Sequence, residues 1–198
     1  MKLRQLIAVH APSLGWTQNQ AIEIAKIVGQ GVDDFKAPGR GPGGGPDATP
    51  YNAALMVLAA LASHGPQTRM AGVVQRLYVT RPAGSDSGVA AIVGDPEARP
   101  ENPWAVCPAT GAPCFGDALK AILASSALAD RVASIDVRRG ANDATIHMTD
   151  GTVSRFVDDY EARQIEHIDA QGDIRAIATI GGRLLADIAR DLAQGVGA

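Results

Sequence analysis

Aromatic residues are scarce in this chain: 3 Phe, 3 Tyr and 2 Trp make up only 4 % of its 198 residues. Because hydrophobic residues still account for 46 %, we expect a folded protein whose core is built from Ala, Leu, Ile and Val. Long apolar runs are missing too, since residues 53–62 fall far short of the roughly 18 that a membrane span requires. The first residues contain no long apolar segment, so we expect no signal peptide, no membrane partner and a cytoplasmic location.

Residue patterns that carry chemistry are also sparse. The only two cysteines, Cys107 and Cys114, are separated by six residues, whereas a zinc knuckle has two between its ligands and needs a second pair. We therefore expect free thiols and no metal site.

The glycines are not followed by the Lys-Ser/Thr of a P-loop, and a Gly-x-Ser-x-Gly nucleophile elbow is absent. The acidic group Asp158-Asp159-Tyr160-Glu161, with Glu166 and Asp169, would suit a metal-dependent enzyme, but carboxylates in a polar loop are more often simply solvated. We expect no enzyme, no catalytic residue and no cofactor.

Neither sign of charge dominates, but the charges are unevenly distributed. The formal net charge is -3; residues 1–80 hold seven Lys or Arg against four Asp or Glu, whereas residues 114–198 hold nine against thirteen. The first part of the chain is therefore the one suited to face a polyanion. Its surplus of positive charge is small for a dedicated nucleic-acid-binding domain.

The chain begins with two short amphipathic helices. Residues 2–10 and 18–29 place apolar side chains at helical spacing, and Thr17 is suited to cap the second helix. Gly29 and Gly31 are expected to end that helix. Two short helices joined by a tight turn, the second with a polar outer side, are typical of a helix-turn-helix.

A Gly- and Pro-rich loop over residues 37–48 leads into a helix with no polar side. Residues 50–62 are almost entirely apolar, with Thr49 as the expected N-cap, and a helix apolar all round belongs at the centre of a domain. Residues 70–78 predict one more amphipathic helix. Residues 1–80 thus predict a helical, helix-turn-helix-like domain that binds DNA.

The rest of the chain has a different pattern. Residues 81–113 are rich in Pro and Gly and predict a linker or surface excursion, with only Val89–Val93 as a possible strand. In residues 114–198, a helix over 117–129 precedes several runs of period-two alternation and a last helix after Gly182. The expected strands are 132–138, 143–148, 152–157 and 173–180, with an Asp150-Gly151 hairpin turn. We therefore predict an α+β protein in which a C-terminal antiparallel β-meander is packed by helices.

A polar stripe marks the outer side of the second helix. Asn19, Glu23, Lys26 and Gln30 recur at spacings of four, three and four. Asn and Gln side chains match adenine in the major groove, and Lys matches guanine or phosphate. The alternative is an ordinary solvated helix surface, and the helix alone favours neither.

The loop that follows tilts the choice towards DNA. Arg40 lies on a slim Gly-Arg-Gly-Pro backbone, and such an arm fits a narrow minor groove or a phosphate; Lys36 is close to it in sequence. A plain flexible connector is the competing interpretation. The candidate DNA-binding residues are therefore Asn19, Lys26, Gln30, Lys36 and Arg40.

The order of these features resembles the N-terminal region of small proteins from phages and prophages of high-GC bacteria. The resemblance lies in the helix led by Thr17, the Gly39-Arg40-Gly41 loop and the Thr49-Pro50 start of the apolar helix over 52–61. The strands and closing helix after residue 130 are loosely similar to the same group. The resemblance implies a phage setting and a DNA-linked task, such as transcription control or genome packaging, and carries over no catalytic residue.

Two functions follow as expectations. The first is a non-enzymatic, DNA-associated phage-type protein, either a transcription regulator or a small terminase-like packaging subunit. Its C-terminal module would supply self-association or bind a protein partner, and a homo-oligomer would multiply weak DNA contacts. The second is an interaction or assembly component without DNA binding, which would use apolar surface around Trp104.

Overall fold

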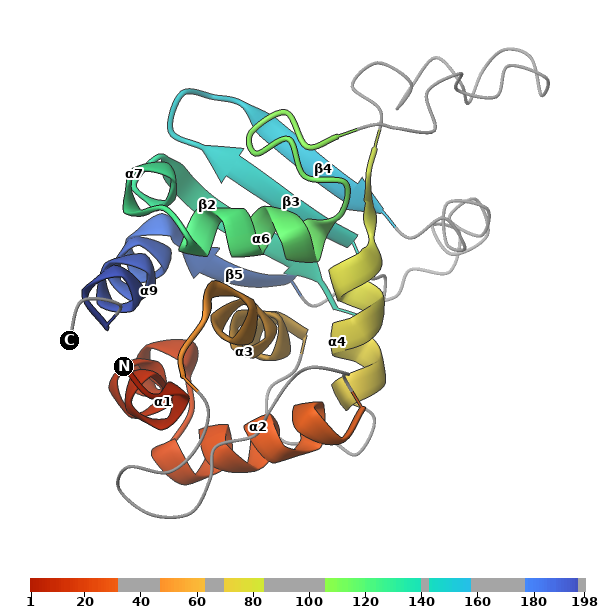
Figure 1. Ribbon diagram of the computed structural model, residues 1–198. Helices are drawn as coiled ribbons and strands as arrows, with labels where there is room; N and C mark the ends of the chain where they lie inside the picture. Colours follow the sequence, from red (N-terminus) through yellow and green to blue (C-terminus); the bar gives the residue numbers. More distant parts are fainter. Residues whose placement is uncertain (32–46, 63–69, 84–105, 140–142, 158–176, 196–198) are drawn as a thin grey trace, which may run out of the picture.

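The computed structural model describes residues 1–31, 47–62, 70–83, 106–139, 143–157 and 177–195. In these ranges seven α-helices accompany a five-stranded antiparallel sheet (Figure 1), which confirms the predicted α+β class. The helices are α1 (Leu3–His10), α2 (Gln18–Gly31), α3 (Pro50–Ala62), α4 (Met70–Val79), α6 (Phe115–Leu123), α7 (Ser126–Ala129) and α9 (Gly182–Gly195), with a short 3-10 turn, η1 (Pro12–Leu14). The strands are β1 (Arg81–Pro82), β2 (Val132–Arg138), β3 (Asp143–Met148), β4 (Val153–Val157) and β5 (Ile177–Gly181).

Helix α3 lies at the centre of the molecule, among the other helices and β5 (Figure 1), and its residues 52–61 are all buried. This confirms the prediction from its lack of a polar side. The helix begins as expected, because the Thr49 hydroxyl accepts the Asn52 N–H at 3.1 Å and Pro50 is its first residue. A hydrophilic substitution in this helix would therefore have no solvent-facing side to occupy.

Arg139 closes the other end of α3. Its Nε donates to the Leu61 carbonyl at 2.9 Å and its Nη2 to the Ala60 carbonyl at 3.3 Å. Carbonyls in a last helical turn lack partners within the helix, and a cation near them also complements the helix dipole. Burial lowers the pKa of this guanidinium below its ordinary value. The end of β2 is thereby tied to the central helix.

The sheet has the strand order β1-β4-β3-β2-β5. Strands β2, β3 and β4 form the predicted meander, and Gly151 adopts a positive φ of 88° in the turn before β4. The fourth expected strand does not extend this meander: β5 pairs with β2 and not with β4, and β1 occupies the edge beside β4. Residues 173–176 of that expected strand lie outside the described residues. One side of the sheet is covered by helices: Phe156 of β4 packs against Phe115 of α6, with ring centroids 5.2 Å apart.

Three other elements differ from the sequence expectation. The single helix expected over 117–129 is two, because Ser125 adopts an extended backbone and its hydroxyl accepts the Leu128 N–H, which starts α7. Helix α2 continues through Gly29 to Gly31. Strand β1 comes from the segment expected to be a linker, while Val89–Val93 and Trp104 lie outside the described residues.

The helices and the sheet share one hydrophobic core. Buried side chains from α1, α2, α3 and α4 form a single cluster with those of α6, α9 and the strands. His10 at the end of α1 also contacts α9, with its Nε2 2.9 Å from Asp191 Oδ2. Within the described ranges, no helix combines the length and the apolarity needed to cross a membrane.

Candidate nucleic-acid interface

Helix α2 owes its start to a reciprocal pair of hydrogen bonds. The Thr17 hydroxyl accepts the Gln20 N–H at 3.2 Å, and the Gln20 side-chain oxygen accepts the Thr17 N–H at 2.8 Å. This capping box satisfies two backbone donors that the helix itself leaves unpaired. The buried side of α2 is the predicted one, made of Ala21, Ile24, Ala25 and Val28.

The opposite side of α2 presents the polar stripe to solvent. Asn19, Lys26 and Gln30 are all exposed. Lys26 is nevertheless paired, because its Nζ lies 2.5 Å from Glu23 Oε1 one turn earlier. Lys36 and Arg40 lie outside the described residues, so three of the five candidate residues are on one helix surface.

The second polar surface is the side of the sheet turned away from the helices, here called the open face. Side chains on a strand alternate between its two sides, and in β3 the apolar side chains of Ala144, Ile146 and Met148 face the helices. The open face therefore carries the intervening residues of each strand. They are Arg81, Ser134, Asp136, Arg138, Asp143, Thr145, His147, Val153, Arg155, Val157, Ile177, Thr179 and Gly181.

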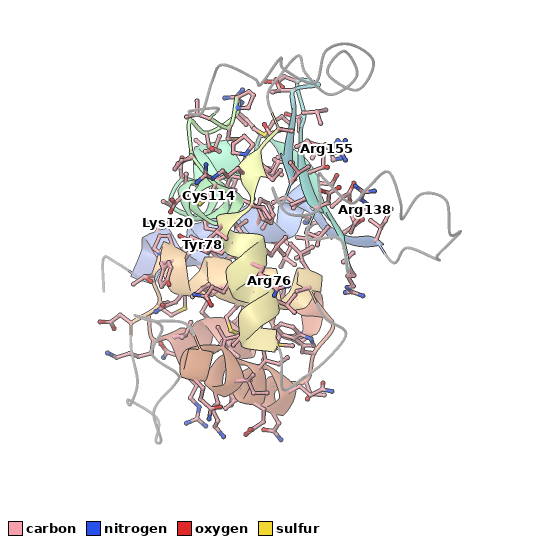
Figure 2. All side chains as sticks on the ribbon, turned by 90° about the vertical axis from the view of Figure 1, so that its right-hand side faces the viewer. Arg76, Tyr78, Cys114, Lys120, Arg138 and Arg155 are labelled. Carbon is pink, nitrogen blue, oxygen red and sulfur yellow. The ribbon has the colours of Figure 1, made fainter. Side chains whose placement is uncertain are left out.

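One end of the open face gathers three arginines from three strands. Arg138 of β2 pairs with Asp143 of β3, and Arg155 of β4 reaches the same carboxylate at 3.2 Å. The Asp143 side chain is 6 % exposed, that of Arg138 25 % and that of Arg155 52 %. Arg81 of β1 is exposed and lies beside Val157 on the same side of the sheet. Figure 2 shows Arg138 and Arg155 on the side of the sheet opposite α6.

The middle of the open face holds a smaller polar network around Asp136. Its Oδ2 lies 3.1 Å from His147 Nε2, and its Oδ1 accepts the Thr179 hydroxyl at 2.7 Å. Three strands contribute one side chain each, so the network links β3, β2 and β5. Since Thr179 donates to the carboxylate and not to the imidazole, the group lacks the nucleophile–base contact of a catalytic triad.

Cys114 and Tyr78 lie near each other at the start of α6 (Figure 2), and both contact Asp117. The Tyr78 hydroxyl donates to Asp117 Oδ1 at 2.9 Å, and the Cys114 thiol lies 3.4 Å from Asp117 Oδ2. Burial, reinforced by the hydrogen bond to Asp117, raises the pKa of the Tyr78 phenol. Burial also raises the pKa of the Cys114 thiol. Because a reactive cysteine needs its thiolate form at neutral pH, this cluster fits a structural role better than nucleophilic chemistry.

A small apolar cavity lies beside His10, between α1, α2, α3 and α9. Its volume is about 20 Å³, with Leu6, Met56, Val57 and Ile188 among its lining residues. Such a space holds about one water molecule. No organic ligand of ordinary size fits there without movement of the helices.

Metal ligands do not gather in the part of the chain that the structure describes: no group of three or more His, Cys, Asp or Glu side chains is arranged to hold an ion. Both cysteines are free thiols in the structure. Comparison with protein-family models, curated proteins and solved structures gave no match. The candidate surfaces are therefore argued from this chain alone.

The arginines of the open face are absent from the sequence-based set of candidates. Strand alternation in 132–138 and 152–157 was a usable signal, because it places Arg138 and Arg155 on the polar side of their strands. The signal that was missing is strand order. Arg81, Arg138 and Arg155 come together only because β1 joins the edge of the meander, and a two-residue strand has no readable alternation.

Proposed function

We propose that the protein is a non-enzymatic, DNA-associated cytoplasmic protein of phage type, acting as a transcription regulator or a small packaging subunit. The observation that carries the proposal is the exposure of Asn19, Lys26 and Gln30 along one side of α2, while the opposite side of that helix is buried. An outer helix with amide and amine side chains along one side can enter a major groove.

The pairing of Lys26 with Glu23 is compatible with DNA contact. An exposed ion pair of this kind contributes only about 0–1 kcal/mol, so Lys26 can exchange its partner for a phosphate or a guanine at small cost. Glu23 can accept a hydrogen bond from the cytosine amino group. With one cation on the stripe the affinity of a single copy is low, and a homo-oligomer would raise it by multiplying contacts.

The test is a salt-titrated mobility shift of a random-sequence duplex with the full chain. The Lys26→Ala/Gln30→Ala variant is expected to bind more weakly, with a log–log salt slope smaller by about 0.9 for one lost phosphate contact. Lys120→Ala/Gln75→Ala removes the same residue types from exposed positions on α6 and α4, and should bind like the parent. Equal affinity of parent and α2 variant would exclude α2 from the interface.

The Gly-rich loop needs its own variant. Lys36→Ala/Arg40→Ala removes both cations of the loop, so the salt slope is expected to fall by about 1.8 if both contact phosphates. An unchanged affinity and slope would remove the loop from the proposed interface while leaving α2 in it.

A second candidate, an assembly component without DNA binding, is favoured by β5. Among the described strands β5 pairs only with β2, its sequence Ile-Ala-Thr-Ile-Gly carries no charge, and Ile177 is 61 % exposed. An uncharged strand edge is a template for pairing with another chain.

Light scattering, together with the DNA-binding assay, separates the two candidates. Assembly is favoured if the chain has no DNA affinity and forms an oligomer that Ile177→Lys disperses and Val9→Lys does not. Val9, which is 59 % exposed on α1, is the matched control.

A further inference from the structure

Among its described residues the open face carries three arginines against two carboxylates, Asp136 and Asp143, and hence a small surplus of positive charge. Asp143 is almost fully buried and contacts both Arg138 and Arg155. One guanidinium suffices to neutralise one carboxylate, so the trio keeps a net positive charge. Arg81, exposed on the neighbouring edge strand, adds another.

The shared carboxylate also orients the arginines. A buried carboxylate with two guanidinium partners fixes both side chains at the sheet surface, and less side-chain freedom is then lost when an anion binds. The side chain of Arg155 is 52 % exposed, so its contact with Asp143 does not cover it. An arginine fork of this kind matches the oxygens of a phosphate.

The strand order sets the length of this basic row. Arg81 on β1 and Arg138 on β2 are separated by β4 and β3, hence by three strand spacings, or about 14 Å. Each DNA strand carries one phosphate per about 3.4 Å of helix axis, so a row of this length laid along the axis spans about four phosphates of one strand. A row of cations across the sheet can therefore contact more than one phosphate.

The kind of contact follows from what else the face carries. Phe, Tyr and Trp are missing from the described part of the open face, so it lacks platforms on which bases could stack. Thr145, next to Arg155 in the register of β3 and β4, adds a hydroxyl. Contacts to phosphates without base readout are what such a surface supports.

We infer that the arginine-bearing end of the open face, formed by Arg81, Arg138 and Arg155, is a phosphate-binding surface that takes the backbone of double-stranded DNA. The inference shares its partner with the proposed function and rests on it to that extent, but it uses a different face of the molecule. Residues 158–161 of the sequence, Asp-Asp-Tyr-Glu, add three negative charges directly after β4. The affinity is therefore modest, and binding is measured from 50 mM salt upwards.

The experiment measures fluorescence anisotropy of a labelled random 20-bp duplex with the full chain, and competition by inorganic polyphosphate. Arg81→Ala/Arg155→Ala leaves the Arg138–Asp143 pair intact and is expected to lower the salt slope by about 1.8. The control Arg131→Ala/Arg190→Ala removes the same charge from exposed side chains before β2 and on α9, and should behave like the parent. Val153→Lys adds a cation at a 53 % exposed position of the same face and should steepen the slope by about 0.9.

The outcomes distinguish this inference from the proposed function. If only the α2 variant weakens duplex binding, the open-face inference is overturned and the proposed function stands. A weakening seen only in the Arg81/Arg155 variant, with a gain in Val153→Lys, supports the inference and removes α2 from the interface. A parent that binds polyphosphate through these arginines but no duplex overturns the DNA assignment and leaves a phosphate-binding surface for another polyanion. Should Arg81→Ala/Arg155→Ala misfold, the gain or its absence in Val153→Lys decides.

Discussion

Gly116 is the residue at which α4 and α6 approach each other closely. The ring of Tyr78 lies so close that a Cβ at position 116 would be 2.2 Å from its Cγ and Cδ2 atoms. The ring cannot easily retreat, because its hydroxyl is bonded to Asp117 and Tyr51 packs edge-on against it, with ring centroids 5.9 Å apart. The missing side chain is therefore what allows α4 and α6 to meet here.

Gly116→Ala is expected to destabilise the protein by about 1–3 kcal/mol, since the added methyl group overpacks a well-filled contact. Gly72→Ala is the matched control on α4. A Cβ there meets nothing within 4 Å, and alanine favours an exposed helix position by about 0.5–1 kcal/mol. Urea unfolding measures both, and equal stability of the two variants would contradict the proposed role of Gly116.

Asp150 in the hairpin between β3 and β4 makes a pH-dependent contribution to the stability of the folded protein. The N–H of Thr152 donates to its Oδ1 at 2.9 Å, Arg131 donates to its Oδ2 at 2.8 Å, and these hydrogen bonds lower the pKa of Asp150 to about 2. The ionised form is thus favoured in the folded state over the unfolded one, whose pKa stays near the model-peptide value of about 3.9.

The stability supplied by Asp150 is complete above the unfolded pKa and is lost as the pH falls towards the folded value. Asp150→Asn is therefore expected to lower Tm at pH 6, and the gap between parent and variant should close between about pH 4 and pH 2. Thermal unfolding monitored by circular dichroism at a series of pH values checks this. A constant gap over the whole range would show that the carboxylate charge is not the cause.

At the scale of elements, hydrophobic periodicity predicts the helices and strands whose ends coincide with the ends of the periodic pattern. The expected strands 132–138 and 143–148 match β2 and β3, because period-two alternation runs through most of each strand. It is interrupted in β2 by a register shift between Val132 and Ser134. The apolar helix α3 was equally readable. The division between α6 and α7 was not, since Leu and Ala favour helix on both sides of Ser125 and only the local hydrogen bond breaks the run.

Ser125→Ala is expected to cost about 0.5–2 kcal/mol, because it removes the side chain that caps α7. The neighbouring Ser126→Ala variant changes a residue inside α7 and should remain within about 0.5 kcal/mol of the parent. Chemical denaturation compares the two. If the position 125 variant were as stable as the position 126 variant, the cap would not be what divides the helix.

The candidate interface was predictable only where one helix supplies it. Asn19, Lys26 and Gln30 share a side of α2 because of helical spacing alone, and their exposure follows from the apolar residues opposite. Arg81 and Arg155, by contrast, are far apart in the chain and meet through pairing of β1 with β4. Sequence periodicity describes each strand but not which strands become neighbours.

At the scale of the whole molecule, α3 is the element that both halves of the chain cover. It packs against α4 and α6 on its sides and against β5, and Arg139 at the end of β2 bonds to its last carbonyls. A loss of packing in α3 is therefore expected to be felt by the N-terminal helices and the sheet together.

Leu58→Ala, at a position with no exposed surface, is expected to cost about 2–5 kcal/mol. In a Trp104→Phe background, the fluorescence of Trp16 follows the N-terminal helices, while far-UV circular dichroism follows the whole chain. The two unfolding curves should coincide and shift together in Leu58→Ala, as in a two-state transition. Val79→Ala, at a 59 % exposed position, should leave both curves in place. Separate transitions would mean that residues 1–80 unfold on their own.

The burial of α3 on all sides has a consequence during synthesis, because the segments that cover it are made at different times. The ribosome releases α3 well before β2 and β5, two strands that pack against it. During that interval only neighbouring helices can cover this apolar helix. Nascent chains with such uncovered surface are prone to stick to one another or to be held by chaperones. A product terminated before residue 132 would keep that surface permanently bare, and cells expressing it should accumulate it in the insoluble fraction.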